Sequence, residues 1–320
     1  MPEIIISEFM DEAAIAEHLG DRNVVYDPKL VERRQDLVGL LADCRALVVR
    51  NRTIVDDALL AEAPRLHTVG RLGVGLDNID VDSCHERGIE VIPATGANDA
   101  AVAEYVIAAA LVLRRPAFLH SAATLSGQWP RPQMIGAECG GATLGLLGFG
   151  STARETARRS AALGMRILAF DPYLPADAAA WQLAEAADLE ALLAEADIVS
   201  VHLPLTDETR DLLDASRIRR MRAGAVLVNA ARGGIVDESA VVESLRSGHL
   251  GGAALDVFAD EPLDAAGGRV FEGLDNLLLT PHIAGVTAES NVRVSRLIAQ
   301  HVAERFREME NGGDRGRRPS

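Results

Sequence analysis

The sequence predicts an α/β protein built from two doubly wound parallel sheets. Short apolar runs typical of buried parallel strands alternate with helical patterns along most of the chain. The length of 320 residues suits two domains that each bury a core of their own. One long apolar stretch, Ala100 to Leu113, breaks the alternation and ends before Pro116, which cannot continue a helix. We therefore expect a hinge beside this helix, near Asn98.

The first series of elements predicts a small flavodoxin-like domain. Its strands are expected at Ile4 to Ile6, Val24 to Tyr26, Leu47 to Val49, Thr68 to Val69 and Glu90 to Ile92. Segments such as Asp11 to Leu19 have the helical pattern that separates parallel strands. The last helical pattern, about 288–309, has no strand left to pair with, so we expect it to return to this domain. The domain would then comprise residues 1–98 and 288–320, of which 311–320 are expected to be disordered.

The second series predicts a larger dinucleotide-binding domain over residues 99–287. Its strands are expected at Thr143 to Leu147, Arg166 to Phe170, Ile198 to His202, Val226 to Val228, Gly252 to Asp256 and Leu277 to Thr280. Ligands of open parallel sheets bind outside the carboxyl ends of the strands. The residues that follow these strands are therefore the candidates for function.

Composition and charge limit the possible partners. The chain is 48% hydrophobic and 25% charged, as expected of a globular protein, and it has no apolar run long enough to cross a bilayer. No secretory signal is visible at the start, so a cytoplasmic location is expected. The net charge of −15 repels polyanions and disfavours nucleic acid as a partner. Cys44, Cys84 and Cys139 form no CxxC pair, so we expect neither a metal site nor a disulfide framework.

A glycine-rich loop after the first strand of the second domain predicts a cofactor site. Gly148 permits a tight turn, Gly150 lets the backbone approach a pyrophosphate, and the small Ala153 packs the helix on the strand. Asp171 ends the next strand, where its carboxylate would accept hydrogen bonds from the adenine ribose. A glycine pattern alone also fits a turn without a ligand, but this context favours a dinucleotide. No arginine follows Asp171 to receive a 2′-phosphate, which favours NAD over NADP.

Three segments that each close an apolar strand predict the catalytic groups. They supply a cation at Arg232, a carboxylate at Glu261 and an imidazole at His282, and the carboxyl ends of parallel strands can bring them to one cofactor. Most other histidines, namely His18, His67, His85, His120, His249 and His301, are expected to be structural. His202 ends a strand before Pro204 and is expected to line the cofactor cleft. The pattern indicates a nicotinamide-dependent enzyme.

Several motifs in this order resemble the D-isomer-specific 2-hydroxyacid dehydrogenases. They are Gly73 to Asp80, Ala101 to Glu104, the glycine loop, Pro204-Leu205-Thr206, Asn229 to Asp237, Asp256-Val257-Phe258 with Glu261-Pro262, and Pro281 to Gly285. The likeness extends from about Arg50 to Thr287 and is strongest to the short form of the 3-phosphoglycerate dehydrogenase branch. It implies an NAD-dependent oxidoreductase that transfers a hydride at C2 of a 2-hydroxy or 2-keto acid. It also implies an active site in the cleft between the domains, and a homodimer formed through the NAD-binding domain.

The resemblance also assigns residues. Arg232 would clamp the substrate carboxylate and carbonyl, since guanidinium binds a carboxylate in bidentate fashion, while His282 would be the acid/base and Glu261 would orient it. Cofactor contacts are expected from Gly148, Phe149, Gly150, Ser151, Thr152, Asp171, His202, Pro204, Thr206, Ala230, Asp256 and Gly285. Substrate contacts are expected from Arg50, Val74, Gly75 and Asn98.

The substrate itself stays open at this point. Arg50, Arg52, Arg71 or Arg131 would bind a distal anionic group if there is one, so 3-phosphoglycerate, hydroxypyruvate or glyoxylate, and a sulfolactate-type acid all fit. A different class of function is an NADH-sensing corepressor-like binding protein of the same fold. The lack of a basic recruitment segment disfavours it, and turnover of a 2-keto acid would decide between the two.

Overall fold

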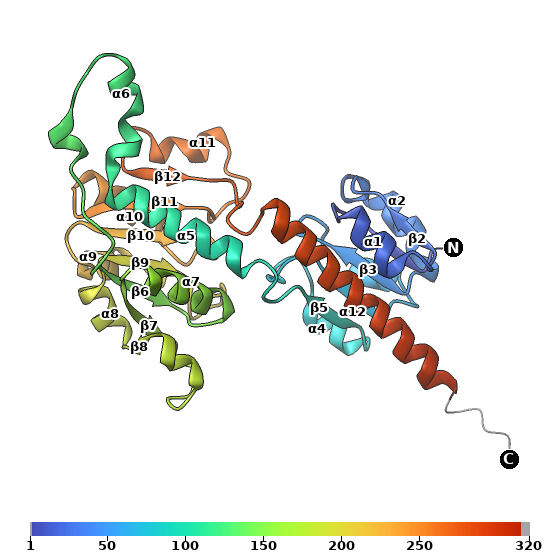
Figure 1. Ribbon diagram of the computed structural model, residues 1–320. Coiled ribbons are helices and arrows are strands. Elements are labelled where there is room, and N and C mark those ends of the chain that lie inside the picture. The colour runs from blue at the N-terminus through green and yellow to red at the C-terminus, as the bar shows by residue number, and fades with distance from the viewer. Residues whose placement is uncertain (1, 315–320) are drawn as a thin grey trace. The chain divides into compact units, whose positions relative to one another are not determined.

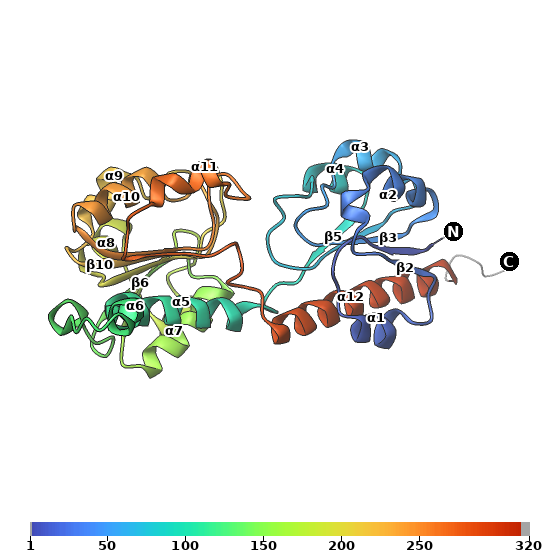
Figure 2. The ribbon, with the colours of Figure 1, turned by 90° about the horizontal axis from the view of Figure 1, so that it is seen from above.

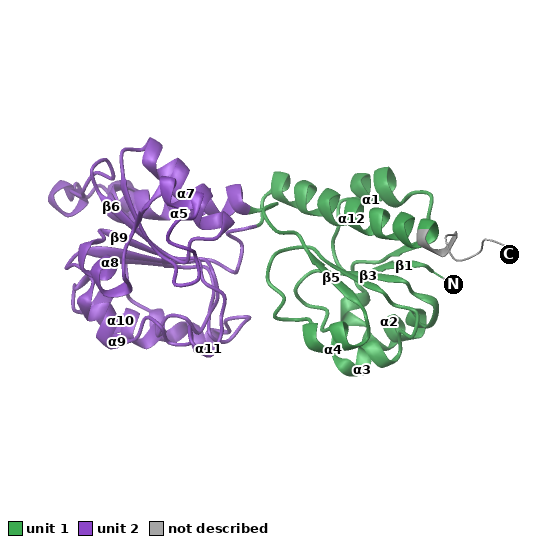
Figure 3. Ribbon diagram, turned by 90° about the horizontal axis from the view of Figure 1, so that it is seen from below, with its two compact units in different colours: residues 1–98, 286–320 green, residues 99–285 purple. Residues whose placement is uncertain are grey.

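The structure is a computed structural model that describes residues 2–314 (Figure 1). The chain forms two compact units, shown in different colours in Figure 3. Unit 1 holds the residues up to Asn98 and those from Val286 onward, and unit 2 holds Asp99–Gly285. The second crossing between the units thus lies two residues before the expected position at 287/288.

Unit 1 contains a parallel sheet with strand order β2-β1-β3-β4-β5. The strands are β1 (Ile4–Ile6), β2 (Val24–Tyr26), β3 (Ala46–Val49), β4 (Thr68–Arg71) and β5 (Glu90–Pro93). The helices are α1 (Glu12–Leu19), η1 (Leu30–Glu32), α2 (Arg34–Leu40), η2 (Leu41–Asp43), α3 (Asp57–Ala61), α4 (Val81–Glu86) and α12 (Ala288–Asp314). This strand order is that of the flavodoxin-like sheet expected from the sequence.

Both faces of the unit 1 sheet are covered, which explains its uniformly apolar strands. Ile4 and Ile6 pack under α1 and α12, whereas Ile5, between them, points to the core of the opposite face. Figure 2 shows α1 and α12 on one side of the sheet and α2, α3 and α4 on the other. The helix α12 continues to Asp314, so the expectation of disorder is wrong for residues 311–314, and residues 315–320 lie outside the described part of the chain.

Unit 2 contains a parallel sheet with strand order β12-β11-β10-β9-β6-β7-β8. The strands are β6 (Thr143–Leu147), β7 (Arg166–Phe170), β8 (Glu185–Ala186), β9 (Ile198–Val201), β10 (Ala225–Asn229), β11 (Leu250–Leu255) and β12 (Leu277–Leu279). The longer helices are α5 (Asp99–Arg114) and α7 (Ser151–Ala162), which pack on one face, and α8 (Leu189–Glu195), α9 (Ala215–Arg220) and α10 (Glu238–Arg246), which pack on the other (Figure 2). Shorter pieces are η3 (Pro116–His120), α6 (Ser121–Leu125), η4 (Arg131–Met134), η5 (Ala179–Leu183), α11 (Ala265–Gly268) and η6 (Arg269–Phe271).

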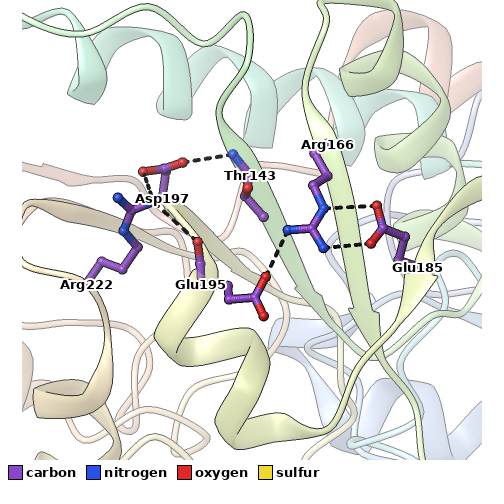
Figure 4. A network of polar contacts seen from close by, with 6 residues as sticks. All are labelled: Thr143, Arg166, Glu185, Glu195, Asp197 and Arg222. Atoms are coloured by element: carbon purple, nitrogen blue, oxygen red, sulfur yellow. Dashed lines mark hydrogen bonds and ion pairs between the residues drawn. The ribbon is translucent and has the colours of Figure 1, made fainter.

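The residues at the amino ends and at the carboxyl ends of the unit 2 strands differ in chemistry. At the amino ends of the strands, Arg166 pairs with Glu185 and Glu195, and Asp197 accepts hydrogen bonds from the Thr143 N–H and from Arg222 (Figure 4). These contacts join neighbouring strands, and each charged side chain has a partner of opposite charge. The strand order reverses at β6, which lies between β7 and β9. Doubly wound sheets bind ligands at the carboxyl ends of the strands beside such a switch point.

A segment of residues 115–137, here called the arm, extends from the end of α5 (Figure 1). Its short helices η3, α6 and η4 contain no buried residue in the structure as described. The arm nevertheless carries large apolar side chains: Phe118, Leu125, Trp129 and Ile135 are each more than 70% exposed. Its ends are held together by a hydrogen bond from the Ala137 N–H to the Arg114 carbonyl (2.8 Å).

Candidate active site

Three neighbouring strands of unit 2 carry the predicted catalytic residues just past their carboxyl ends. In the register of the sheet, Asn229 of β10 lies beside Leu255 of β11, and Leu255 lies beside Leu279 of β12. Arg232 and His282 each follow three residues beyond these positions, and Glu261 lies in the loop after β11. The sheet thus brings these three loops to the carboxyl ends of neighbouring strands.

His282 and Glu261 are in direct contact. Nδ1 of His282 lies 2.8 Å from Oε2 of Glu261, and Oε1 of Glu261 accepts the backbone N–H of Phe258 at 3.0 Å. Because a carboxylate can only accept, Nδ1 carries the hydrogen in this pair. Nε2 of a partly exposed imidazole is then the atom left to exchange a proton with a substrate.

The backbone of His282 is held as firmly as its side chain. His282 has φ of +53°, a left-handed conformation that residues with a β-carbon seldom adopt. The N–H groups of His282, Ile283 and Ala284 all donate to Asp256, to its carbonyl, Oδ1 and Oδ2 respectively, each at 2.8 Å. Asp256 is 1% exposed. The structure therefore places Asp256 beneath the His282 loop, and its expected contact with the cofactor stays a prediction.

The Arg232 loop packs against the Glu261 loop. The buried Asn229 side chain accepts the Ala231 N–H (3.1 Å) and donates to the Arg232 carbonyl (2.9 Å), which shapes the turn after β10. A Cβ at Gly233 would lie only 1.8 Å from the Phe258 carbonyl oxygen. Glycine at this position allows the close approach of the two loops, and Phe258 is the residue whose N–H binds Glu261.

The two glycines of the glycine loop have different surroundings. Gly148 has φ of +86°, and a Cβ there would lie 2.6 Å from the His202 carbonyl oxygen, so the fold itself demands glycine. A Cβ at Gly150 would meet no described atom within 4 Å. Gly150 precedes α7, whose first N–H groups have no side-chain cap among the described residues. These features fit a dinucleotide phosphate at the start of α7.

Asp171 and Phe149 are joined within this loop. The Asp171 carboxylate accepts the N–H of Phe149 (2.9 Å) and that of Tyr173 (3.0 Å). The Phe149 side chain is fully buried and stacks on Trp181, with 5.4 Å between ring centroids, so it contributes packing and has no exposed side chain to offer a cofactor. Asp99, which the sequence did not single out, accepts hydrogen bonds from the hydroxyls of Ser151 and Thr152.

The remaining predicted cofactor residues also come after the carboxyl ends of strands in this sheet. His202 and the Pro204–Thr206 turn follow β9, Ala230 follows β10, and Gly285 follows the His282 loop. Burial lowers the pKa of the His202 imidazole to about 4, and its Nε2 lies 3.0 Å from the Ser200 hydroxyl. His202 is therefore neutral near pH 7, which does not suit an acid/base role at that pH.

Two of the four candidate arginines lie at the carboxyl ends of adjacent strands of unit 1, and the other two lie elsewhere. Arg71 is the last residue of β4, in register with Val49, and Arg50 is the residue after Val49 at the end of the adjacent β3. The Arg71 guanidinium lies against Gly73, where a Cβ would be 1.6 Å from Nη1, and Val74 and Gly75 continue this loop. The other two candidates are Arg52, which pairs with Glu32 on the surface, and Arg131, which lies in the arm of unit 2.

The loop that carries Arg50 is fixed by a buried carboxylate that the sequence did not reveal. Glu8 is 4% exposed and accepts the N–H groups of Arg50 (2.8 Å), Thr53 (2.9 Å) and Arg52 (3.2 Å). The Arg50 guanidinium donates to Oδ1 of Asn291 at 2.8 Å. Asn98, another predicted substrate residue, has a buried Oδ1 with no hydrogen-bond partner among the described residues. A lone Glu after a strand carries no pattern that predicts such a contact.

The described residues form neither a metal-ion cluster nor a membrane-spanning helix. No group of three or more His, Cys, Asp or Glu side chains in this part of the chain is arranged to hold a metal ion. Within residues 2–314, no helix has the length and apolar character needed to cross a membrane.

Comparison with known proteins identifies the family. A model described as "D-isomer specific 2-hydroxyacid dehydrogenase, NAD binding domain" matches residues 107–284, more than half of the chain. The (S)-sulfolactate dehydrogenase of Chromohalobacter salexigens is 54% identical over 303 residues, covering 94% of this chain and 97% of that protein. The D-3-phosphoglycerate dehydrogenase of Archaeoglobus fulgidus is 36% identical over 300 residues, which are 94% of this chain but only 56% of that protein.

A solved structure agrees with these matches. The D-lactate dehydrogenase of Aquifex aeolicus, crystallised with NAD and lactic acid, has a TM-score of 0.81 and 26% identity, and the match covers 99% of this chain and 100% of that one. The chain belongs to the D-isomer specific 2-hydroxyacid dehydrogenases, NAD-dependent oxidoreductases that transfer a hydride between the nicotinamide and C2 of a 2-hydroxy acid.

Proposed function

We propose that the protein oxidises (S)-sulfolactate to the corresponding 2-keto acid with NAD. The observation that carries this proposal is the identity of 54%, over nearly the full length of both chains, to a protein named (S)-sulfolactate dehydrogenase. The matched D-3-phosphoglycerate dehydrogenases are less similar, and the chain spans about half of their length. The relatives named here are dehydrogenases, which supports an enzyme rather than a corepressor.

The configuration of the substrate agrees with a D-specific site. In sulfolactate, sulfur gives the CH2SO3⁻ group a higher priority than the carboxylate, whereas in lactate and 3-phosphoglycerate the carboxylate has the higher priority. The S label therefore describes the same spatial arrangement around C2 as the D label does in those acids. One arrangement of Arg232, His282 and cofactor would serve all of them.

The pair of arginines in unit 1 supports a distal anion. Arg71 ends β4 and Arg50 follows the adjacent β3 in a protein with a net charge of −15, and the backbone N–H of Arg50 donates to Glu8. Burial lowers the pKa of Arg50 from its usual value, because a desolvated guanidinium is less stable as a cation. A sulfonate has three acceptor oxygens and would offset that desolvation through charge-assisted hydrogen bonds. We assign this pair the role of sulfonate subsite.

The reacting groups come from unit 2. Arg232 would hold the C1 carboxylate and polarise the C2 oxygen without giving up its own proton. Nε2 of His282 would take the proton of the C2 hydroxyl while the C2–H bond breaks with its electron pair and the C2 carbonyl forms. Glu261, through Nδ1, would stabilise the imidazolium produced in this step. In the reduction direction the same Nε2 would return the proton to the C2 oxygen.

NAD, when bound, supplies the acceptor for the hydride that leaves C2. The residues that would hold it are Gly150, Ser151 and Thr152 at the start of α7 for the pyrophosphate, and Asp171 for the adenine ribose. Pro204, Thr206, Ala230 and Gly285 are the other predicted contacts. The open space in front of Gly150 is the feature that fits this assignment best.

We further propose that the enzyme works in the cytoplasm, where an NAD-linked enzyme finds its cofactor.

We also propose that the enzyme is a homodimer joined through the arm. Four large apolar side chains on one exposed segment are unusual for a monomer surface and suit a surface shared between two copies. Changing Leu125 and Trp129 together to Asp should convert the dimer to a monomer in sedimentation experiments. A monomeric wild-type enzyme would contradict this assignment.

The substrate proposal is tested with a panel of 2-hydroxy acids and NAD. (S)-Sulfolactate should give the highest kcat/KM, ahead of (R)-sulfolactate, D-3-phosphoglycerate and D-lactate. Arg50→Ala should raise KM for (S)-sulfolactate about 10- to 100-fold, the range for loss of a charge-assisted hydrogen bond, and should leave KM for D-lactate nearly unchanged. Arg52→Ala, two residues away and paired with Glu32, is the matched control. A preference for D-3-phosphoglycerate, or equal KM changes for both acids, would refute the proposal.

A further inference from the structure

We infer that Tyr105 is a positioning residue for His282, acting through the hydroxyl of Thr280 and the carboxylate of Asp256. All four residues belong to unit 2, with Tyr105 on α5 and the others at the carboxyl ends of β11 and β12. The inference rests on the proposed acid/base role of His282. It adds to that role a residue of α5, outside the loops that carry Arg232, Glu261 and His282.

The hydrogen bonds of this group have a defined direction. The Thr280 hydroxyl donates to Oδ1 of Asp256 at 2.6 Å, because an ionised carboxylate can only accept. A hydroxyl has one hydrogen, so the contact of 2.6 Å between the Tyr105 and Thr280 oxygens must use the hydrogen of Tyr105. Burial raises the pKa of Tyr105, which keeps that hydrogen in place. The chain of donors therefore runs from Tyr105 through Thr280 to Asp256.

The chain ends on the group that shapes the His282 loop. Oδ1 of Asp256 accepts from both Thr280 and the Ile283 N–H, and Oδ2 accepts the Ala284 N–H. A buried carboxylate needs such donors, and hydrogen bonds in series polarise one another. Loss of the Tyr105 hydroxyl leaves Thr280 a weaker donor to Asp256. Loss of the Thr280 hydroxyl removes one of the donors outright.

Weaker hydrogen bonding of Asp256 should change the position of His282, because the left-handed backbone of His282 depends on Asp256. That conformation is unfavourable for a residue with a β-carbon and persists only when its surroundings impose it. Three successive N–H groups bound to Asp256 impose it here. When these contacts loosen, the loop can relax and Nε2 moves from its position, and small displacements of a reacting group lower the rate of the chemical step.

The experiment is a double-mutant cycle on the full-length enzyme, assayed with (S)-sulfolactate and NAD. Tyr105→Phe and Thr280→Val remove single hydroxyls and preserve shape, and each should lower kcat about 2- to 10-fold with the Kd for NADH unchanged. Because the two hydroxyls act in series, the double variant should match Thr280→Val alone. Thr280→Ser, which keeps the hydroxyl, should restore most of kcat. Tyr26→Phe is the matched control, since the Tyr26 hydroxyl donates to the Met10 carbonyl in unit 1.

Several results would overturn the inference: a Tyr105→Phe enzyme with wild-type kcat, effects on kcat that multiply in the double variant, or a loss of thermal stability with kcat unchanged. His282→Ala, assayed in parallel, separates this from failure of the proposed function. If His282→Ala is inactive and Tyr105→Phe behaves as wild type, only the role of Tyr105 is wrong. If His282→Ala turns over normally, the acid/base assignment itself is wrong.

Discussion

Nδ1 of His282 and Oε2 of Glu261 lie 2.8 Å apart and join the loops that follow β12 and β11. The other carboxylate oxygen of Glu261 accepts the Phe258 N–H, so the carboxylate cannot turn away without losing a backbone contact. The pair fixes both the position and the tautomer of the imidazole.

Glu261→Gln should therefore lower kcat by about tenfold or more, because a neutral amide no longer stabilises the imidazolium formed in the reaction. NADH affinity should not change. Glu238→Gln is the matched control, since Glu238 accepts the neighbouring Ala259 N–H (2.7 Å), a contact that an amide oxygen can retain. Steady-state assays of both variants check this, and equal effects would show that only the shape of the loop matters.

Two glycines of one loop should respond differently to alanine. Gly148→Ala places a Cβ 2.6 Å from a backbone oxygen at a positive φ, so it should lower the melting temperature as well as cofactor affinity. Gly150→Ala meets no described protein atom, so it should leave the melting temperature unchanged and weaken NADH binding by about tenfold or more. Thermal unfolding and NADH titration of both variants test this. Unchanged NADH affinity in Gly150→Ala would place the pyrophosphate elsewhere.

Asp171→Ala should weaken NAD binding and relax discrimination against NADP, because a ribose acceptor and a charge that repels the 2′-phosphate disappear together. The Phe149 N–H also loses its acceptor, so the loop itself should loosen somewhat. Titration of both cofactors separates these effects. A proportional loss for NAD and NADP would mean that Asp171 only supports the loop.

Both units should lose stability in mild acid. Burial is the main cause that lowers the pKa of His202 and of His67 from the usual 6.5 to about 4. In the unfolded chain these two imidazoles bind protons near pH 6.5, whereas in the folded chain they bind them only near pH 4. The free energy of unfolding therefore falls as the pH drops from about 6.5 to about 4. His202→Gln should flatten the decline in melting temperature, whereas replacement of the exposed His85 should not. Parallel curves for wild type and His202→Gln would contradict this.

Most strands of the two sheets could be predicted because they are short apolar runs, and the central ones, such as β1, β3, β6, β9 and β10, are buried on both faces. The β8 strand was missed, since its two residues, Glu185 and Ala186, are exposed and have no apolar signature. The end of α12 was also missed. Residues 311–314 are Asn, Gly, Gly and Asp in the sequence, types with low helix propensity, so the pattern does not show that the helix continues through them.

The candidate reacting residues could be located at the ends of neighbouring strands because motifs mark them, and their roles stay predictions. The contacts that support them could not be predicted. Asp256, Thr280 and Tyr105 come from three elements far apart in the sequence, and only the folded sheet shows that they form one chain of hydrogen bonds. Glu8 is a similar case, since a buried carboxylate that binds backbone N–H groups resembles any surface glutamate in the sequence. Local patterns identify groups that react and say little about contacts between distant loops.

The central claim, that His282 exchanges the substrate proton during hydride transfer, is tested most directly by single-turnover kinetics of His282→Ala with (S)-sulfolactate and saturating NAD. The account predicts NADH formation slowed by about 10²-fold or more, with NAD affinity close to that of the wild type, because the imidazole acts on the substrate and not on the cofactor phosphates. A single-turnover rate equal to that of the wild type would contradict it.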